Sequence, residues 1–470
     1  MEHDRTAPAG ITLALVGFAS SFAVVLAGLR GVGASAEQAA SGLLVLCALQ
    51  AVGMLYLAHR YRIPVTLAWS TPGAALLAGT GAAPGGWPAA VGAFLVVGVL
   101  VLLTALWPPL GRIVAAIPRP VAQGMLAGIL FSLCLAPFRA LVADPVVIAP
   151  LVALWLVLVR RLPAWASPLV LGAALVLIVV EAPWPTIDGS DLLPTVELVR
   201  PVLDAQAVLG LALPLYLVTM ASQNVPGAAV LSSFGYRVPW RASLTVTGAG
   251  TVAGSLAGGH AVNLAAITAA MAASPDVHAD PDRRWRASVV AAWTYLALAV
   301  ASSGLVILAS HARPGLLETV AGLALLATLG SSLASATEDP AARVPAVVTF
   351  VVAASGTAVL GIGSAFWALL AGVGCWVLLV PRGGGHPAGA PVARAGSGTT
   401  PVMTTPNDEP LERADEADLI EQRQDLDGAG SVTAPEVTPD EADEADAVEQ
   451  GAEVTTDDDA YPHQAEADEE

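Results

Sequence analysis

The segment that decides the fold of this chain reads Leu67-Ala68-Trp69-Ser70-Thr71-Pro72-Gly73-Ala74-Ala75-Leu76-Leu77. Its apolar ends flank a polar break. A hydroxyl residue followed by proline signals the start of a helix, because the hydroxyl caps free backbone N–H groups and proline tolerates the first helical turn. We expect Thr71 to supply a capping oxygen. A half-helix that starts here would direct its positive dipole end and its free N–H donors toward the protein interior, as an anion site does.

The composition around this segment is that of a membrane protein with an acidic end. Of the 470 residues, 55% are hydrophobic and 13% are charged, whereas an ordinary soluble protein has about 25% charged residues. The first 400 residues carry a net charge of +4 and the last 70 a net charge of −22. These values exclude a soluble multi-domain enzyme, a nucleic-acid-binding protein and a disulfide scaffold. Residues 383–470 are expected to form a disordered, acidic cytoplasmic tail.

Fourteen apolar segments are candidates to cross a bilayer core of about 30 Å, which takes about 20 residues of helix. The third and the tenth are short and are interrupted by polar residues, proline or glycine. Such breaks occur at membrane depth only where the freed backbone is buried in protein or lines a cavity. We therefore predict an all-α polytopic membrane protein embedded in the lipid bilayer, with broken spans 3 and 10. The spans cover residues 11–29, 39–58, 65–79, 89–107, 121–136, 145–160, 165–182, 207–224, 242–257, 262–273, 288–309, 317–336, 344–361 and 364–380.

The arginines in the loops predict the orientation of these spans. Loops after even-numbered spans carry twelve arginines, and loops after odd-numbered spans carry four. Since cytoplasmic loops are enriched in basic residues, we expect both termini in the cytoplasm, beginning with a short cytoplasmic N-terminus at residues 1–10. The absence of lysine and the abundance of Ala, Gly and Val are typical of a GC-rich genome. The expected location is a bacterial inner (plasma) membrane.

Weak internal similarity predicts two halves, a first seven-span repeat at residues 11–200 and a second, inverted repeat at residues 201–382. Many secondary transporters are built in this way. Because each half has an odd number of spans, the second half must lie upside down relative to the first. The matching segments pair spans 1 and 8, 3 and 10, and 5 and 12: Val16–Ser21 with Val218–Gln223, Gly73–Leu77 with Leu264–Thr268, and Val121-Ala122 with Val320-Ala321.

Two further polar breaks accompany the one in the third span. The tenth span contains Gly258-Gly259-His260-Ala261-Val262-Asn263 before the apolar run 264–273, and the eighth contains Ser222-Gln223-Asn224-Val225-Pro226-Gly227. Half-helices that meet at the third and tenth spans would place opposed N-termini around one substrate. Polar groups in apolar spans either serve such a site or only hold helices together. The candidate substrate-binding residues are Ser70, Thr71, Gly73, Ser222, Gln223, Asn224, Gly259, His260 and Asn263, with Ser20 and Ser21 as further polar lining.

The charge of the spans favours an anionic substrate. No Asp or Glu lies well inside any span, whereas a cation site or a carboxylate proton relay would require a buried acid. The titratable side chain near the central breaks is His260, whose ordinary pKa of about 6.5 lies in the working range of a proton-coupled carrier. We expect His260 to take up the coupled proton. The alternatives are that it only hydrogen-bonds the substrate, or that hydroxyls and water relay the proton.

The chain lacks the signatures of an enzyme. It has no paired-histidine metal motif and no phosphate-binding loop, so we expect no metal, no cofactor and no catalytic residues. Cys47, Cys134 and Cys375 lie far apart in apolar stretches and are expected to be inert buried thiols.

Over about residues 8–380 the chain closely resembles the benzoate–proton symporter family (BenE type). The resemblance implies a seven-plus-seven inverted fold like that of nucleobase and sulfate transporters, with core and gate domains. It also implies uptake of benzoate or a similar aromatic carboxylate together with a proton. The acidic tail departs from the family. The matching motifs are Leu67–Leu77, Leu217–Gly227, Asn263–Ala270, Ala321–Leu326 and Gly361–Trp367.

Three alternatives remain beside an aromatic-carboxylate carrier. One is a carrier of the same fold for nucleobases or another small anion, although the eighth span lacks the acid that favours nucleobases. The others are an anion channel and a membrane-embedded enzyme, the latter with no supporting motif. The expected partners are a small aromatic carboxylate, a proton and the lipid bilayer, with no nucleic acid. The sequence leaves open whether the protein forms a homodimer.

Overall fold

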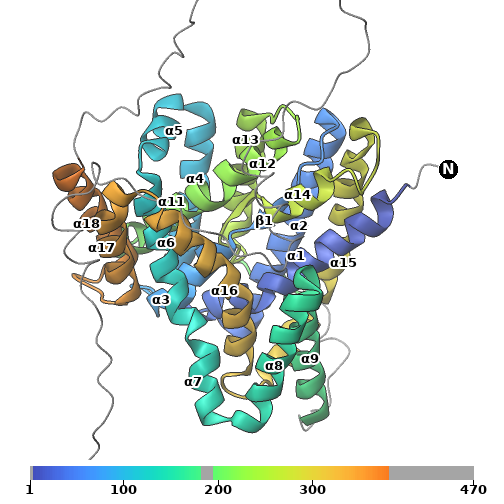
Figure 1. Ribbon diagram of the computed structural model, residues 1–470, viewed down its shortest axis with the longest axis horizontal. Coiled ribbons are helices and arrows are strands. Elements are labelled where there is room, and N and C mark those ends of the chain that lie inside the picture. Colours follow the sequence, from blue (N-terminus) through green and yellow to red (C-terminus); the bar gives the residue numbers. More distant parts are fainter. Residues whose placement is uncertain (1–3, 182–193, 381–470) are drawn as a thin grey trace, which may run out of the picture. The chain divides into compact units, whose positions relative to one another are not determined.

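The computed structural model describes residues 4–181 and 194–380, and Figure 1 shows their arrangement. The predicted acidic tail at 383–470 lies outside the described residues. The first half of the chain forms β1 (Leu67–Trp69) and nine α-helices: α1 (Thr6–Gly31), α2 (Ala36–Tyr61), α3 (Thr71–Thr80), α4 (Trp87–Leu106), α5 (Pro108–Ala115), α6 (Arg119–Cys134), α7 (Ala136–Ala143), α8 (Pro145–Arg161) and α9 (Ala166–Glu181).

Within residues 194–380 the chain consists of helices and one short strand, β2 (Val262–Leu264). Its eighth span is one continuous helix from Ala205 to Ser233 that contains two π-helical segments. The helical segments are α10 (Ala205–Ala207), η2 (Val208–Ala212), α11 (Leu213–Thr219), η3 (Met220–Asn224), α12 (Val225–Ser233), α13 (Trp240–Ser255), α14 (Ile267–Ala273), α15 (Trp285–Ser310), α16 (Leu316–Thr337), α17 (Arg343–Ala354) and α18 (Ser364–Leu379).

The helices have the lengths and composition of a multi-pass membrane protein. Among the described residues, eight helical segments are long and apolar enough to cross a membrane. Every predicted span overlaps a helix or a strand followed by a helix. The expected all-α architecture differs from the structure at two places: Leu67–Trp69, just before the polar break of the third span, forms β1, and Val262–Leu264, at the end of the break in the tenth span, forms β2. Strand pairing satisfies the backbone groups that the broken helices leave free.

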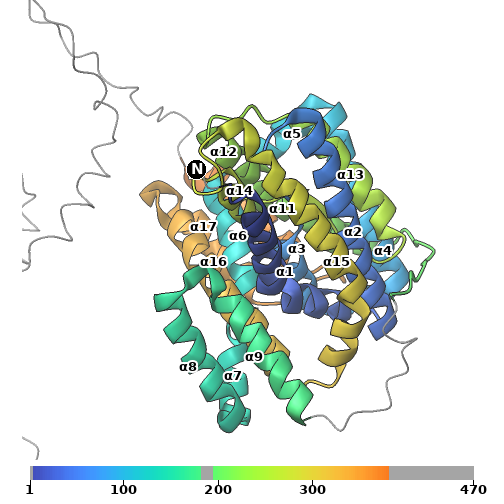
Figure 2. The same cartoon turned by 90° about the vertical axis from the view of Figure 1, so that its right-hand side faces the viewer.

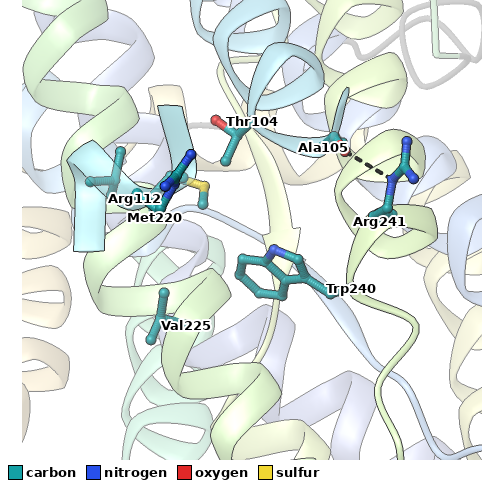
Figure 3. Close-up of a pocket in the computed structure, with 9 residues that line it drawn as sticks. Thr104, Ala105, Arg112, Met220, Val225, Trp240 and Arg241 are labelled. Atoms are coloured by element: carbon teal, nitrogen blue, oxygen red, sulfur yellow. Dashed lines mark hydrogen bonds between the residues drawn. The ribbon is translucent and has the colours of Figure 1, made fainter. Parts of the chain in front are cut away.

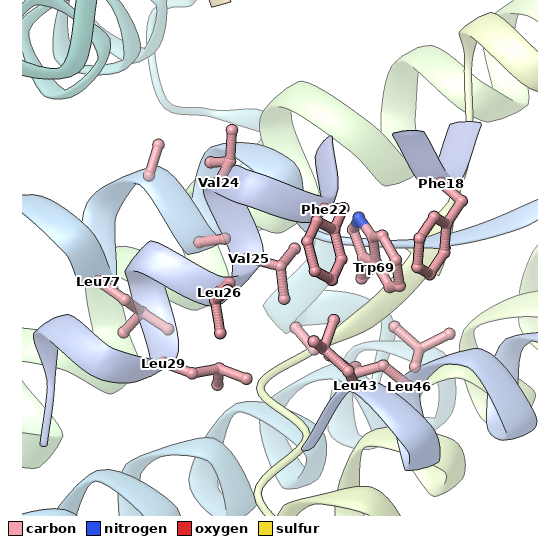
Figure 4. Close-up of a cluster of buried hydrophobic side chains, with 14 of the residues drawn as sticks. Phe18, Phe22, Val24, Val25, Leu26, Leu29, Leu43, Leu46, Trp69 and Leu77 are labelled. Carbon is pink, nitrogen blue, oxygen red and sulfur yellow. The ribbon is translucent and has the colours of Figure 1, made fainter. Parts of the chain in front are cut away.

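One group of helices surrounds the start of the third span. Helix α1 packs against α3 and α15, and α2 packs against α15 and β1. Figure 4 shows the indole of Trp69 beside the rings of Phe18 and Phe22. The ring centroid of Phe18 lies 5.4 Å from that of Trp69 and 5.4 Å from that of Phe22. A Cβ at Gly28 would lie 2.5 Å from the carbonyl oxygen of Ala74. Glycine is therefore required where α1 approaches α3, as is common for helices packed in membranes.

A second group consists of α6, α16, α17 and α18, with α7, α8 and α9 beside it. Helix α6 packs against α16 and α17, and a Cβ at Gly124 would lie 2.5 Å from the carbonyl oxygen of Ala346. Helices α7, α8 and α9 group together at the bottom of Figure 2. Arg313, in the loop after α15, forms ion pairs with Asp144 and Glu181 at the ends of α8 and α9.

Crossing of the broken spans as a candidate site

Strands β1 and β2 bring the third and tenth spans together in an antiparallel pair. Ala68 lies opposite Asn263 at the centre of this ladder. The ladder is extended on one side by the bond from the Ser70 N–H to the Ala261 carbonyl, at 3.1 Å, and on the other by the bond from the Ala265 N–H to the Thr66 carbonyl. Each broken span therefore supplies the hydrogen-bond partners that the other lacks, which confirms the expected proximity of the two breaks.

The start of α3 is fixed by Ser70, not by Thr71 as expected. The Oγ of Ser70 accepts the N–H of Gly73 at 3.1 Å and the hydroxyl of Thr219 at 2.8 Å. Thr71 is the first helical residue, one position past the cap, and its side chain is half-buried. Ser70 has the extended backbone conformation of a capping residue, whereas Thr71 is already helical. A capping side chain bonds the N–H two or three residues ahead, and because Pro72 has no N–H, Ser70 bonds that of Gly73.

Glycine is required at position 73. A Cβ there would lie 2.7 Å from the Oγ of Ser70 and would also clash with Leu215 of α11. The same close approach lets Thr219, at the end of α11, reach the cap. The candidate residue Gly73 thus serves the packing of α3 on the eighth span.

His260 is completely buried beside the same cap. Its Nε2 lies 3.0 Å from the backbone carbonyl of Ser70. Because a carbonyl can only accept, Nε2 must carry the hydrogen, which leaves Nδ1 as a lone-pair acceptor. Within the described residues Nδ1 has no hydrogen-bond partner. The ring of Phe94 on α4 packs edge-on against the imidazole, with the centroids 6.3 Å apart.

Asn224 and Asn263 are both fully buried, and both bond the backbone at Leu264. The Oδ1 of Asn224 accepts the N–H of Leu264 at 3.0 Å, and the Nδ2 of Asn263 donates to the Leu264 carbonyl at 2.8 Å. The Oδ1 of Asn263 is without a partner among residues 4–181 and 194–380. Asn224 closes the π-helical segment η3, and π-helical turns are often found at functional sites. The bond between Asn224 and Leu264 thus holds the tenth span to the eighth.

The remaining candidate residues lie around this centre in different ways. Ser21 accepts the indole N–H of Trp69 at 2.7 Å and so orients β1, whereas Ser20 bonds only the Gly17 carbonyl of its own helix. Ser222 likewise bonds the Val218 carbonyl of its own helix. Gln223 is half-buried, and its side chain makes no hydrogen bond to any described residue. Gly259 turns back onto the end of α13, where its N–H bonds the carbonyl of Gly254 at 2.8 Å.

Helix α14 starts at Ile267, three residues later than the predicted run from Leu264. Leu264 instead belongs to β2, so the sequence alignment of Gly73–Leu77 with Leu264–Thr268 pairs the interior of α3 with the end of β2 and the start of α14, and its register is wrong. The N-cap position of α14 is Ala266, which has no side-chain cap, and Ile267 is 74% exposed. The starts of α3 and α14 lie at opposite ends of the ladder, since Ser70 pairs with Ala261 and Thr66 with Ala265.

Four residues that the sequence did not single out hold the crossing in place. Thr251 accepts the N–H of Val262, and Thr66 accepts the hydroxyl of Thr268 at 2.9 Å. Thr219 bonds the cap, and Arg284 donates from Nη1 to the carbonyl of Ala273, the last residue of α14. No sequence motif marks the three threonines as structural partners of the strands. Arg284 lies among the loop arginines, from which only the orientation was predicted.

Comparison with known proteins agrees with this architecture. A family described as benzoate membrane transport protein matches residues 3–378. The inner membrane protein YdcO of Escherichia coli (strain K12) is 37% identical over 373 residues, which cover 79% of this chain and 95% of that protein. The benzoate membrane transport protein of Acinetobacter baylyi (strain ATCC 33305 / BD413 / ADP1) is 28% identical over 382 residues, covering 80% and 95%.

Among solved structures, the transmembrane domain of a cyanobacterium bicarbonate transporter, BicA, has the same fold. It superposes with a TM-score of 0.51 at 17% sequence identity, covering 78% of this chain and 96% of that domain. At this identity the likeness concerns the fold alone. Together with the family match, it indicates a multi-pass membrane transporter rather than an enzyme.

Proposed function

The chain belongs to the benzoate membrane transport family, and we propose that it is a secondary active transporter that imports benzoate or a related aromatic carboxylate together with a proton. The observation that carries this proposal is the crossing of the broken spans, where the capped start of α3 lies against a buried histidine of the tenth span. An aromatic carboxylic acid is ionised at neutral pH. Its coupled import therefore needs donors for the anion and a group that takes up a proton.

We assign the substrate carboxylate to the start of α3. Pro72 has no N–H, and the N–H of Gly73 is bonded to Ser70. Thr71 is left with a backbone N–H and a hydroxyl that no other described residue engages, on a half-buried residue. Both donors lie at the positive end of the helix dipole, where an anion is stabilised. The polar candidates Ser222, Gln223 and Asn263 complete the proposed surroundings.

We assign the coupled proton to His260. Its free Nδ1 can be protonated without breaking the bond from Nε2 to the Ser70 carbonyl. The imidazolium would then place a positive charge beside the start of α3, and this charge favours binding of the carboxylate. By linkage, the bound anion favours protonation to the same extent. This reciprocity is what a symporter requires.

We further propose that all fourteen predicted spans cross the inner membrane as two inverted seven-span repeats, with both termini in the cytoplasm. The antiparallel pairing of β1 with β2 supports this arrangement, because an inverted repeat relates its two broken spans by a two-fold axis. Topology reporters fused at Gly85 and at Arg161 test it. We expect an external signal at Gly85 and a cytoplasmic signal at Arg161, and the reverse pattern would contradict the proposal.

The function is tested with the purified full chain in sealed proteoliposomes and radiolabelled benzoate. An inward proton gradient should drive accumulation of benzoate above equilibrium, and a protonophore should abolish it. Competition should come from other aromatic acids but not from benzamide or uracil. Uptake that only equilibrates would indicate a channel, because a channel cannot concentrate its solute. Uptake inhibited by uracil as strongly as by benzoic acids would favour a nucleobase carrier.

A further inference from the structure

A cavity of about 320 Å³ lies away from the ladder, between the end of α4, the short helix α5, the π-helical segment η3 and the start of α13. Figure 3 shows the indole ring of Trp240 in the middle of this lining, with Thr104 above it and Val225 below. The volume is at the lower end of the range typical for small-molecule sites, about 300–1,000 Å³. The lining residues are Thr104, Ala105, Gly111, Arg112, Val114, Met220, Val225, Trp240 and Arg241.

The lining combines an apolar wall with unpaired positive charge. Arg112 and Arg241 are exposed, and neither forms an ion pair with any residue that the structure describes. Arg241 uses Nε to donate to the carbonyl of Ala105, which leaves its terminal nitrogens available. Arginine is well suited to bind a carboxylate through two parallel hydrogen bonds. An aromatic face beside it, here Trp240, suits a flat ring.

The side chain of Met220 connects the cavity to the broken spans. Met220 lines the cavity and is itself buried, and its sulfur lies 3.3 Å from the Nδ2 of Asn224. The other amide atom of Asn224, Oδ1, accepts the N–H of Leu264 in β2. A ligand in the cavity would therefore contact the residue that packs on Asn224, but would not touch the ladder itself.

From this geometry we infer that the cavity is a second binding site for a small aromatic carboxylate, with the carboxylate at Arg112 and Arg241 and the ring against Trp240 and Met220. The inference rests on the proposed function for the identity of the ligand. Arg112 in α5 and Arg241 in the first turn of α13 belong to the segments between predicted spans that the charge pattern assigns to the cytoplasm. The site therefore holds the acid between the central crossing and the cytoplasm, as a release site on the import path.

Tryptophan fluorescence tests this site separately from the central one. The probe is 4-nitrobenzoate, whose nitroaromatic ring quenches nearby indoles, added to the full chain in nanodiscs of phosphatidylcholine. Trp69 lies in β1 and reports the central crossing, whereas Trp240 reports the cavity. We expect saturable quenching whose Trp240 component disappears in Trp240→Phe, and whose Trp69 component disappears in Trp69→Phe.

Substitutions at the cavity mouth then identify the ligand chemistry. Arg112→Gln should weaken the Trp240 component about tenfold, because a charge-assisted hydrogen bond is lost. The matched control Arg119→Gln, an exposed arginine that does not line the cavity, should leave it unchanged. The neutral analogue 4-nitrobenzamide should not produce the Trp240 component.

Three results would overturn the inference: no quenching that depends on Trp240, equal quenching by the neutral amide, or loss of the Trp240 component when phosphatidylglycerol is included in the nanodiscs. The last result would mean that the cavity takes an anionic lipid. Failure of the proposed function looks different. Benzoate uptake would then be absent from proteoliposomes and the Trp69 component would be missing, whatever happens at Trp240.

Discussion

The third and tenth spans are built alike, as a strand followed by a half-helix, yet they are fixed at opposite ends. Helix α3 is held at its start, where Ser70 bonds both Gly73 and Thr219. Helix α14 has no side-chain cap at its start, but Arg284 holds the carbonyl of Ala273 at its end. The start of α3 is therefore positioned as a rigid donor site. The start of α14 is held through the ladder, through Asn224 and through the bond from Thr268 to Thr66.

The largest effect on transport is expected from His260→Gln, because His260 belongs to the tenth span but bonds the capping residue of the third. Glutamine keeps a donor toward the Ser70 carbonyl but cannot be protonated near neutrality. In the wild type, affinity for benzoate should rise as the pH falls, because the imidazolium favours the anion. In the variant this pH dependence and proton-driven accumulation should be lost, while exchange of labelled for unlabelled benzoate persists.

Proteoliposome uptake at several pH values, with and without a proton gradient, measures both properties. A variant that still accumulates benzoate with the wild-type pH profile would mean that hydroxyls or water relay the proton and that His260 is only a structural partner of Ser70.

The next largest effect is expected from Gly73→Ala in α3. The added Cβ would overlap the Oγ of Ser70 and Leu215, and overpacking of this kind costs about 1–3 kcal/mol. We expect a roughly tenfold to hundredfold loss of benzoate uptake, measured as initial rate. Gly79→Ala in the same helix is the matched control, since a Cβ there has only the Oγ of Ser132 nearby, at 3.8 Å. Equal losses of uptake in Gly73→Ala and Gly79→Ala would contradict a particular role for the start of α3.

The end of α14 is tested by Arg284→Gln. Arg284 is buried and donates hydrogen bonds to the carbonyls of Ala273, His278 and Ala279. Hydrogen bonds from charged groups contribute about 1.5–3 kcal/mol each, so we expect a clear fall in the thermal midpoint of the purified protein. The neighbouring Arg283→Gln removes only an exposed ion pair with Asp280, which is worth at most about 1 kcal/mol. If the two variants melt alike, α14 is not held at its end by Arg284.

The smallest effects are expected from two variants that distinguish the capping residue, Ser70, from the proposed anion donor, Thr71. Ser70→Ala removes a cap worth about 1 kcal/mol, which leaves the N–H of Gly73 without its partner. It should lower both the thermal midpoint and the benzoate affinity. Thr71→Val should lower the affinity roughly fivefold and leave the midpoint unchanged. Isothermal titration calorimetry with benzoate and thermal unfolding of the two variants measure the affinity and the midpoint. An unchanged affinity in Thr71→Val would place the anion elsewhere than at the start of α3.

The sequence predicted the positions of the helices because long apolar runs favour helices that cross a membrane. It also predicted from their polar breaks that the third and tenth segments meet. It did not predict β1 and β2. Three residues such as Leu67–Trp69 are too few for a twofold alternation to be visible, and the strands exist only because each supplies the hydrogen bonds of the other. Local propensity therefore contains no signal for them.

The candidate site was predicted in composition but not in detail. Serine and threonine both occur often as capping residues, and the choice of Ser70 depends on where the backbone becomes helical and on the arrival of Thr219 from the eighth span. Asn224 was predicted as a substrate-binding residue, but its bond to Leu264 depends on the π-helical turn of η3. The cavity beside Trp240 is formed by α4, α5, η3 and α13, and no single segment of sequence indicates it.

The ladder between Ala68 and Asn263 also has a consequence for biogenesis. A ribosome adds about 5–20 residues per second, so the interval between synthesis of the two strands is roughly 10–40 s. During that interval the backbone of β1 has no strand partner, although an unpaired peptide group in hydrocarbon costs several kcal/mol. The N-terminal half therefore cannot reach its final structure on its own. It has to wait, in contact with water or the insertion machinery, until the tenth span emerges.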